Sequence, residues 1–227
     1  MPLSRRMRSR IVRHHLPLAV VTLAALLAVY VLVPSKNPKF RWSMATAYVG
    51  LALIGATLAL GPLNVLRRRP NPVSSDLRRD VGIWAGVLSI VHFVVGWQVH
   101  MKHRYLYWLR EVKDTGALRP RTDLFGFANY TGLVATIIAA VLVALSNDYF
   151  LRRLGTTRWK WWQRWNYGLL ALVVAHGVAF QVIEKRRIAY VVGFTALLAA
   201  TAAMQYLGVR AVRGAAANPK TSTRGTV

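Results

Sequence analysis

The stretch WKWWQRWNYGLLALVVAHGVAFQVIE (Trp159–Glu184) indicates the structural class of this chain. It opens with four tryptophans among basic residues and continues as an apolar run long enough to cross a lipid bilayer. A single histidine, His176, lies near the far end of that run. A second stretch, LRRDVGIWAGVLSIVHFVVGWQVH (Leu77–His100), has the same plan, with two arginines at its start and His92 deep inside it. The two stretches therefore predict membrane helices that each carry one buried histidine.

Six stretches of the chain are apolar over roughly the 20 residues that a membrane-spanning helix needs. They are residues 16–34, 43–66, 81–99, 126–146, 165–183 and 188–207. With 227 residues in all, this pattern predicts an all-α integral membrane protein with one six-helix bundle over residues 16–207. Residues 1–15 are predicted to be a basic cytoplasmic segment, and residues 208–227 a disordered cytoplasmic tail.

The formal charge of +24 resembles that of a nucleic-acid-binding protein, but the long apolar runs exclude that class, so we expect membrane lipid as the partner and no nucleic acid. The chain has no cysteine, which excludes disulfides, thiolate ligands and iron–sulfur clusters. Arg5–Arg6 resembles the start of an export signal, but the apolar run that follows is long and lacks a small-residue cleavage site. We therefore expect a retained first helix.

The distribution of Lys and Arg predicts the orientation. The N-terminus, the 67–80 and 147–164 loops and the tail together carry nineteen, whereas the three connections on the other side carry twelve. The more basic side is expected in the cytoplasm. Both termini then lie inside, in a multi-pass protein of the bacterial inner membrane.

Two connections carry aromatic residues beside charged ones. HRYLYWLREVKD (His103–Asp114) alternates apolar and charged residues at near-helical spacing, which predicts a short amphipathic helix at the membrane interface. The same segment could instead be a docking surface for a partner. The 147–164 segment is rich in tryptophan and arginine and is typical of an interfacial aromatic belt.

The chemistry of the chain centres on His92 and His176. All seven carboxylates lie in predicted loops or at helix ends, which argues against proton pumps and cation-coupled transporters. His92 follows Arg79 by thirteen residues and His176 follows Arg164 by twelve, so both lie roughly 18–20 Å from the inner boundary on helices that run in the same direction. Two imidazoles at one level can supply both axial ligands of a b-type haem. The alternative is a pair of histidines that only form hydrogen bonds to neighbouring helices.

These runs resemble a known family. The run from Arg152 to His176, with RRLG, RWK, a following tyrosine and a histidine, is similar to the ferric-reductase-like transmembrane domain family, and most similar to its MsrQ branch, the haem-binding membrane subunits of periplasmic methionine sulfoxide reductase systems. LRRDVGIWAGVLSIVHF (Leu77–Phe93) resembles the second signature of that family. The resemblance covers about residues 43–207. It implies a six-helix bundle with b haem that passes electrons outward to a periplasmic reductase.

The chain departs from the family at one level of the bundle. Members commonly have a second histidine thirteen residues before the one that matches His176, and here that position is Gln163; the matching position before His92 is Arg79. We therefore expect one haem, near the outer face. A flavin such as FMN, or a quinone, is a further candidate at the Arg79–Gln163 level. The candidates for pairing with haem propionates or a flavin phosphate are Arg78, Arg79, Arg153 and Arg164.

The predicted function is electron transfer from a cytoplasmic or membrane donor, a flavin reductase or a quinol, to a periplasmic acceptor, as the membrane subunit of a reductase. No dinucleotide-binding fingerprint is present, so oxidation of a nicotinamide cofactor is expected on another protein. The alternatives are a stand-alone ferric-chelate reductase and a non-redox scaffold or channel. His100 and His103 are expected to be solvated, although His103 could lie on an outer exit route.

Overall fold

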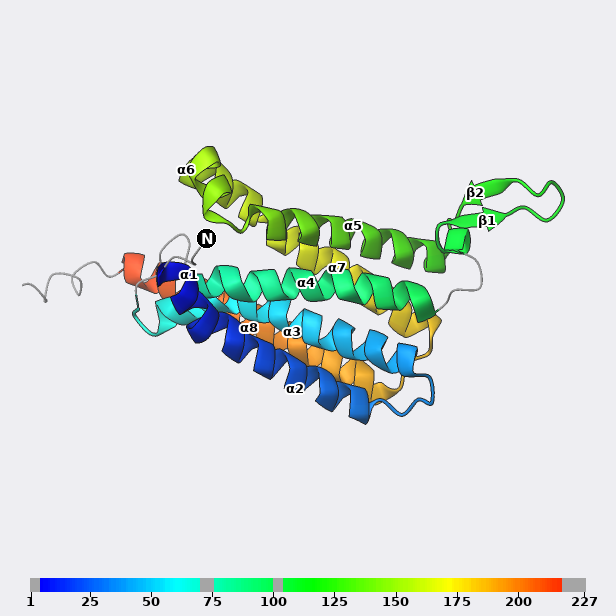
Figure 1. Ribbon diagram of the computed structural model, residues 1–227, viewed down its shortest axis with the longest axis horizontal. Helices are drawn as coiled ribbons and strands as arrows, with labels where there is room; N and C mark the ends of the chain where they lie inside the picture. The colour runs from blue at the N-terminus through cyan, green and yellow to red at the C-terminus, as the bar shows by residue number, and fades with distance from the viewer. Residues whose placement is uncertain (1–4, 70–75, 100–103, 218–227) are drawn as a thin grey trace, which may run out of the picture.

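The protein is a bundle of long helices that lie side by side, as the computed structural model shows (Figure 1). The structure describes residues 5–69, 76–99 and 104–217. Within those residues, six helical segments are long and apolar enough to cross a membrane. The principal helices are α2 (Leu16–Leu32), α3 (Pro38–Leu66), α4 (Asp76–Val99), α5 (Leu124–Leu145), α7 (Trp165–Ile183) and α8 (Ile188–Ala217). The six predicted apolar stretches coincide with these helices, so the all-α prediction is confirmed.

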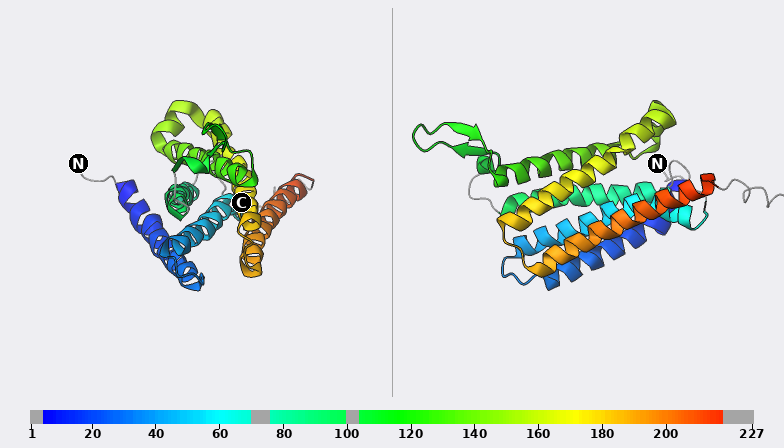
Figure 2. Two further views of the ribbon diagram at one scale, coloured as in Figure 1. Left: turned by 90° about the vertical axis from the view of Figure 1, so that its right-hand side faces the viewer. Right: turned by 180° about the vertical axis from the view of Figure 1, so that it is seen from behind.

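Helix α3 lies at the centre of one half of the bundle. It packs against α2, α4 and α8, while α5 packs against α4 and α7. Seen along the bundle, α2 and α8 lie on opposite sides of α3 (Figure 2). The outward surface of α2 carries large exposed apolar side chains, which suits a helix surrounded by lipid. These side chains are Val20, Val21, Leu23, Leu27, Val31 and Leu32.

Small residues set the distance between the central helices. The buried core joins α3, α4, α5 and α7 and contains three alanines. It consists of Ile54, Ala85, Ala135, Ala139, Leu142 and Leu169. Gly86 on α4 faces α5 so closely that an added Cβ would overlap the Val143 side chain and lie 3.3 Å from the Ala139 carbonyl oxygen. Small residues at such a contact let two membrane helices approach until their backbones nearly touch.

The chain begins with a continuous helical run, α1 (Arg5–Arg10) and the π-helical turn η1 (Ile11–His15) leading directly into α2. The predicted boundary between a basic segment and a first helix at residue 15 is therefore wrong. The reason is Asp80, the fifth residue of α4, whose side chain is fully buried and bonded to Arg10, His14 and His15. A buried carboxylate requires such partners, so it holds the first helical turns against the bundle.

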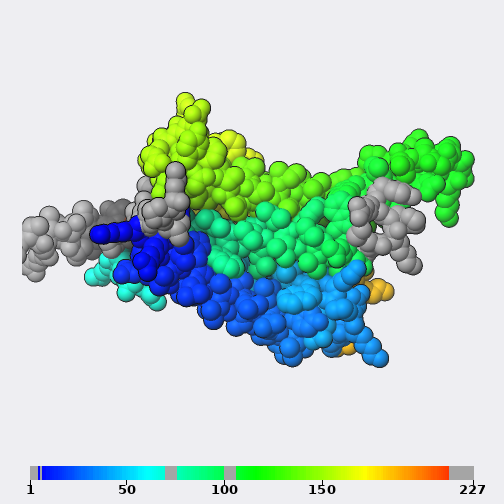
Figure 3. Space-filling model, viewed as in Figure 1, coloured from blue at the N-terminus to red at the C-terminus, as the bar shows by residue number. Residues whose placement is uncertain are grey.

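The 147–164 segment, expected as a loop, forms the helix α6 (Asp148–Gln163). Asn147 caps its start by accepting a hydrogen bond from the Phe150 amide, and Gly155, with φ of +71°, kinks it. Trp159 is its one buried residue and donates to the Leu145 carbonyl oxygen at 2.9 Å. The helix projects from one end of the bundle (Figure 3). The aromatic residues of this segment therefore lie on a helix that bends away from the axis of the bundle.

The amphipathic helix predicted for His103–Asp114 is wrong. A short 3₁₀ turn η2 (Arg104–Tyr107) is followed by the antiparallel hairpin β1 (Leu109–Glu111) and β2 (Leu118–Pro120), which projects from the other end of the bundle (Figure 1). Gly116 adopts φ of +65°, and its amide donates to the Val112 carbonyl oxygen at 2.8 Å. A turn that needs this conformation favours glycine, and it reverses the chain before a helix can form.

Helix α5 begins at a capped and charge-paired residue just after the hairpin. The Asp123 carboxylate accepts a hydrogen bond from the Gly126 amide at 2.7 Å and pairs with Arg121 at 2.6 Å. Arg121 and the Gly126 amide hold the pKa of Asp123 below its usual range, which keeps the cap ionised at neutral pH. The cap fixes where the hairpin ends and the membrane helix begins.

The last helix is longer than its apolar pattern predicts. Helix α8 continues to Ala217, so the predicted boundary at residue 207 is wrong, and residues 218–227 lie outside the described part of the chain. The extension contains four alanines and two arginines, which favour helix although they are not a membrane-spanning pattern. His100 and His103 also lie outside the described residues.

We expect Gly86→Ala to destabilise the bundle by about 1–3 kcal/mol, because the added Cβ would overlap Val143 and force α4 and α5 apart. Thermal unfolding in detergent measures the loss. Gly82→Ala is the matched control on the same helix, since its Cβ would meet only Thr57 Cγ2 at 3.5 Å. Equal unfolding temperatures for the two variants would contradict the close approach of α4 and α5.

We expect Asp80→Asn to cost roughly 3 kcal/mol, because Arg10 would lose the buried carboxylate that pairs with it. Limited proteolysis of the N-terminal turns, together with thermal unfolding, measures the effect. Asp76→Asn in the first turn of the same helix should cost less, since Asp76 is only partly buried. A larger loss of stability for Asp76→Asn than for Asp80→Asn would contradict the anchoring role of Asp80.

Candidate functional site

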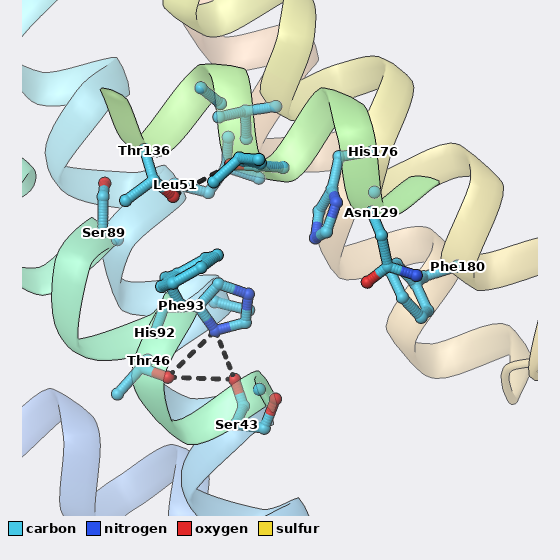
Figure 4. A pocket seen from close by; sticks show the side chains of 18 of the residues that line it. Ser43, Thr46, Leu51, Ser89, His92, Phe93, Asn129, Thr136, His176 and Phe180 are labelled. Carbon is cyan, nitrogen blue, oxygen red and sulfur yellow. Dashed lines mark hydrogen bonds between the residues drawn. The ribbon is translucent and has the colours of Figure 1, made fainter. Parts of the chain in front are cut away.

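The structure brings His92 and His176 together inside the bundle, as their similar spacing from Arg79 and Arg164 predicts. His92 comes from α4 and His176 from α7. Their ring centres are 6.2 Å apart and their planes are nearly perpendicular, at 85°. Figure 4 shows the two rings on facing helices, turned toward one another.

Both rings are fixed through the same nitrogen. His92 Nδ1 lies 3.1 Å from the Ser43 carbonyl oxygen and 3.1 Å from Thr46 Oγ1. His176 Nδ1 lies 2.8 Å from the Ala128 carbonyl oxygen. A carbonyl oxygen only accepts hydrogen bonds, so Nδ1 must carry the proton and donate it. In each neutral ring the lone pair is therefore on Nε2, the arrangement found when imidazole binds a metal.

Two glycines shape the space around the histidines. An added Cβ at Gly132 on α5 would lie 2.6 Å from His176 Nδ1, so the absence of a side chain there lets the imidazole lie against α5. Gly50 on α3 is buried and lines the same cavity, yet an added Cβ would meet nothing within 4 Å. Gly132 therefore lets the His176 ring lie close to α5, whereas Gly50 borders open space in the cavity.

The separation of the rings suits one metal ion held between them. With metal–nitrogen bonds of about 2.0–2.1 Å and about 1.1 Å from each nitrogen to its ring centre, two opposed imidazoles have centres roughly 6.2–6.4 Å apart. The observed distance of 6.2 Å agrees. Within the described residues no group of three or more His, Cys, Asp or Glu side chains could hold a metal ion. The pair therefore lacks the further protein ligands of a tetrahedral zinc site.

A cavity of about 180 Å³ surrounds the two histidines, and we call it the outer cavity. Its walls come from α3, α4, α5, α7 and α8, and its lining is mainly apolar. Three of its lining residues carry buried N–H groups without a hydrogen-bond partner: Trp97 Nε1, Trp108 Nε1 and Arg186 Nη1. Arg186 also pairs with Glu184 through Nη2 at 2.8 Å. Unpaired buried donors are costly, so these groups indicate a place for an acceptor such as a carboxylate.

Sequence reasoning missed Trp97, Trp108 and Arg186. Trp97 lies among the apolar residues of α4 and has the pattern of a lipid-facing aromatic. Trp108 lies in the segment expected to be an interfacial helix. Arg186 belongs to the EKRR turn, where basic residues are explained by the membrane boundary alone. Only the packing of these three segments around one cavity reveals their relation to the histidines.

The inner candidates gather around a second cavity of about 550 Å³, which we call the inner cavity. Arg78, Arg79, Gln163 and Arg164 all line it. Arg153, the remaining candidate, is exposed on α6 and is not among the lining residues, so its predicted place at this site is wrong. The kink in α6 turns the segment around Arg153 away while bringing Gln163 to the bundle.

Arg79 has a structural partner that the sequence did not indicate. Its side chain is 4% exposed; Nη1 pairs with Asp148 at 2.5 Å and Nη2 donates to the Ser146 carbonyl oxygen at 3.1 Å. Asp148 is the first residue of α6, so this pair joins α4 to the start of the projecting helix. Arg79 therefore forms part of the wall of the inner cavity, and its ion pair with Asp148 fixes its position.

The apolar core cluster separates the two cavities. Ile54 and Leu169 belong to the cluster and line the outer cavity, whereas Leu142 belongs to it and lines the inner cavity. This layer, which we call the septum, has no titratable side chain among its buried members. The protein therefore contains two chemically distinct compartments along one bundle.

Comparisons with family models, curated proteins and solved structures find no match for this chain. The functional interpretation therefore depends on the geometry of the two compartments and on the sequence resemblance alone.

Proposed function

We propose that this protein is a b-haem electron-transfer subunit of a membrane-bound reductase. The observation that carries the proposal is the pair of facing imidazoles, 6.2 Å apart between ring centres, each held through Nδ1. The lone pairs on the Nε2 atoms of His92 and His176 would then hold the iron of a haem, which would supply a one-electron carrier.

A haem held by both histidines would carry one electron at a time and would leave no iron position for a substrate. The chain's own residues fix both ring orientations through Ser43, Thr46 and Ala128. The apolar lining limits water around the iron and thereby influences its potential. Residues near the cavity mouth, Arg186 and Trp97, offer N–H donors for the carboxylates of a haem.

The direction of transfer follows from the positive-inside assignment. The inner cavity then lies toward the cytoplasm and the hairpin β1–β2 toward the periplasm. Electrons would enter from a flavin or quinol donor and leave toward a periplasmic reductase partner, in an inner-membrane protein similar to the methionine sulfoxide reductase subunits. A stand-alone ferric-chelate reductase would share the same haem and differ only in its acceptor.

We expect purified protein from haem-supplied cells to show a b-type reduced-minus-oxidised spectrum with about one haem per chain, because His92 and His176 together form one site. His92→Ala and His176→Ala should each lower haem content at least tenfold. Ser89→Ala is the control, since Ser89 lines the same cavity but donates to the Ala85 carbonyl oxygen of its own helix. A pyridine haemochrome assay counts the haem.

A folded wild-type protein without haem would overturn the proposal and leave the scaffold or channel alternative. Two haems per chain would instead mean that the inner cavity supplies ligands other than histidine. Purified periplasmic reductase added to the reduced protein, compared with ferric chelate, distinguishes the subunit from a stand-alone ferric reductase.

We expect Gly132→Ala to weaken haem binding about tenfold or more, because the new Cβ would lie 2.6 Å from His176 Nδ1 and displace the ring from the Ala128 carbonyl. Haem titration of the apoprotein, followed by absorbance, measures the change. Gly193→Ala is the control, since its Cβ would meet only Tyr48 Cε1 at 3.7 Å. Unchanged haem affinity in Gly132→Ala would show that haem binding does not need the His176 ring to lie against Gly132.

A further inference from the structure

The inner cavity carries a charge pattern that the histidine pair does not explain. Five basic residues and no carboxylate are among its described lining residues. The basic residues are Arg78, Arg79, Lys160, Arg164 and Arg213. They come from α4, α6, α8 and the junction of α6 with α7, so residues distant in sequence converge on one space. A cavity with this lining favours a negatively charged ligand.

The Arg78 side chain packs against Gly61 in the wall of the inner cavity. An added Cβ at Gly61 on α3 would lie 2.5 Å from Arg78 Nη2 and 3.3 Å from its Cζ. The guanidinium group therefore lies against the backbone of α3 at Gly61, where a side chain is absent. This position brings a charge from the first turn of α4 into the space between the helices. A surface arginine that only follows the positive-inside rule does not need such a contact.

The remaining polar groups of the cavity divide into paired and unpaired ones. Tyr167 donates to Gln205 Oε1 at 3.1 Å, and Gln205 Nε2 donates to the Leu58 carbonyl oxygen at 2.7 Å, so these form a closed wall. Asp148 and the Ser146 carbonyl oxygen hold the Nη1 and Nη2 atoms of Arg79. By contrast, Gln163 Nε2 and Arg79 Nε are buried and have no hydrogen-bond partner. Gln163 thus offers a donor beside Arg164, its neighbour in the sequence.

The other side of the cavity is apolar. Leu58, Val65, Leu142, Val209 and Val212 line it from α3, α5 and α8. A ligand that fills this space needs a negative group for the arginines and an apolar part for the helices. Phosphate esters bind guanidinium groups through charge-assisted, often bidentate hydrogen bonds, and basic pockets between membrane helices bind the headgroups of anionic lipids.

We propose that the inner cavity binds an anionic phospholipid, whose headgroup phosphate is held by Arg78, Gln163 and Arg164. The acyl chains of the lipid would lie against the apolar side of the cavity. The septum separates this cavity from the histidines, so the inference is independent of haem binding.

The test is native mass spectrometry of delipidated protein in neutral detergent, with four probes. Phosphatidylglycerol and phosphatidylcholine form the lipid arm, while flavin mononucleotide and riboflavin form the soluble arm; the members of each pair differ in net charge. We expect phosphatidylglycerol to bind about tenfold more tightly than phosphatidylcholine. A preference for flavin mononucleotide over riboflavin without any preference for phosphatidylglycerol would assign the cavity to the flavin expected from the sequence and overturn the lipid proposal.

Variants connect the preference to the cavity. Arg78→Gln and Arg164→Gln should each weaken the anionic probe about tenfold, and Arg78→Lys should restore part of the affinity. Arg152→Gln is the matched control, because Arg152 is exposed on α6 and does not line the cavity. Gly61→Ala tests the contact between Arg78 and α3 independently. Its Cβ would meet only the flexible end of Arg78, so the fold should persist.

Circular dichroism and ligand-free unfolding temperatures establish that the variants fold. Equal binding of charged and neutral probes in both arms would overturn the proposal. So would an equal loss in Arg152→Gln, because the anion would then respond to the general surface charge. Unchanged binding in Arg78→Gln, Arg164→Gln and Gly61→Ala together would likewise exclude this cavity.

Discussion

The structure depends on the requirement that polar groups inside an apolar bundle find partners within the protein. His92 and His176 meet this requirement with main-chain carbonyl oxygens of neighbouring helices, Ser43 on α3 and Ala128 on α5. Each bond uses Nδ1 and leaves Nε2 for another role. The partner that stabilises each ring thus also determines which nitrogen can bind a metal.

The same requirement explains the peripheral contacts. Asp80 is fully buried and joins the first helical turns to α4 through Arg10 and His14, and Arg79 joins α4 to α6 through Asp148. Adjacent residues of α4 therefore anchor two different parts of the chain. These ion pairs lie at one end of the bundle, near the start of α4.

The two cavities differ in the chemistry that they can support. The outer cavity is mainly apolar around two neutral imidazoles, whereas the inner cavity combines an apolar wall with a cluster of cations. The septum between them contains only apolar side chains among its buried members. A redox group in one compartment and an anionic amphiphile in the other would each meet suitable side chains, without sharing a ligand. Because the two cavities are separate, ligand binding at each can be tested without altering the other.

The sequence by itself determined the six long helices, because an apolar run of about 20 residues has few stable alternatives in a bilayer. It also placed His92 and His176 at one level, since helical rise converts spacing into height. The tertiary structure alone decided the rest. Trp97, Trp108 and Arg186 meet around the outer cavity through contacts between distant segments, which periodicity does not encode. The hairpin replaced a predicted helix because Gly116 permits a turn. Helix α6 formed where a loop was expected, because Asn147 caps it and Trp159 packs against the end of α5.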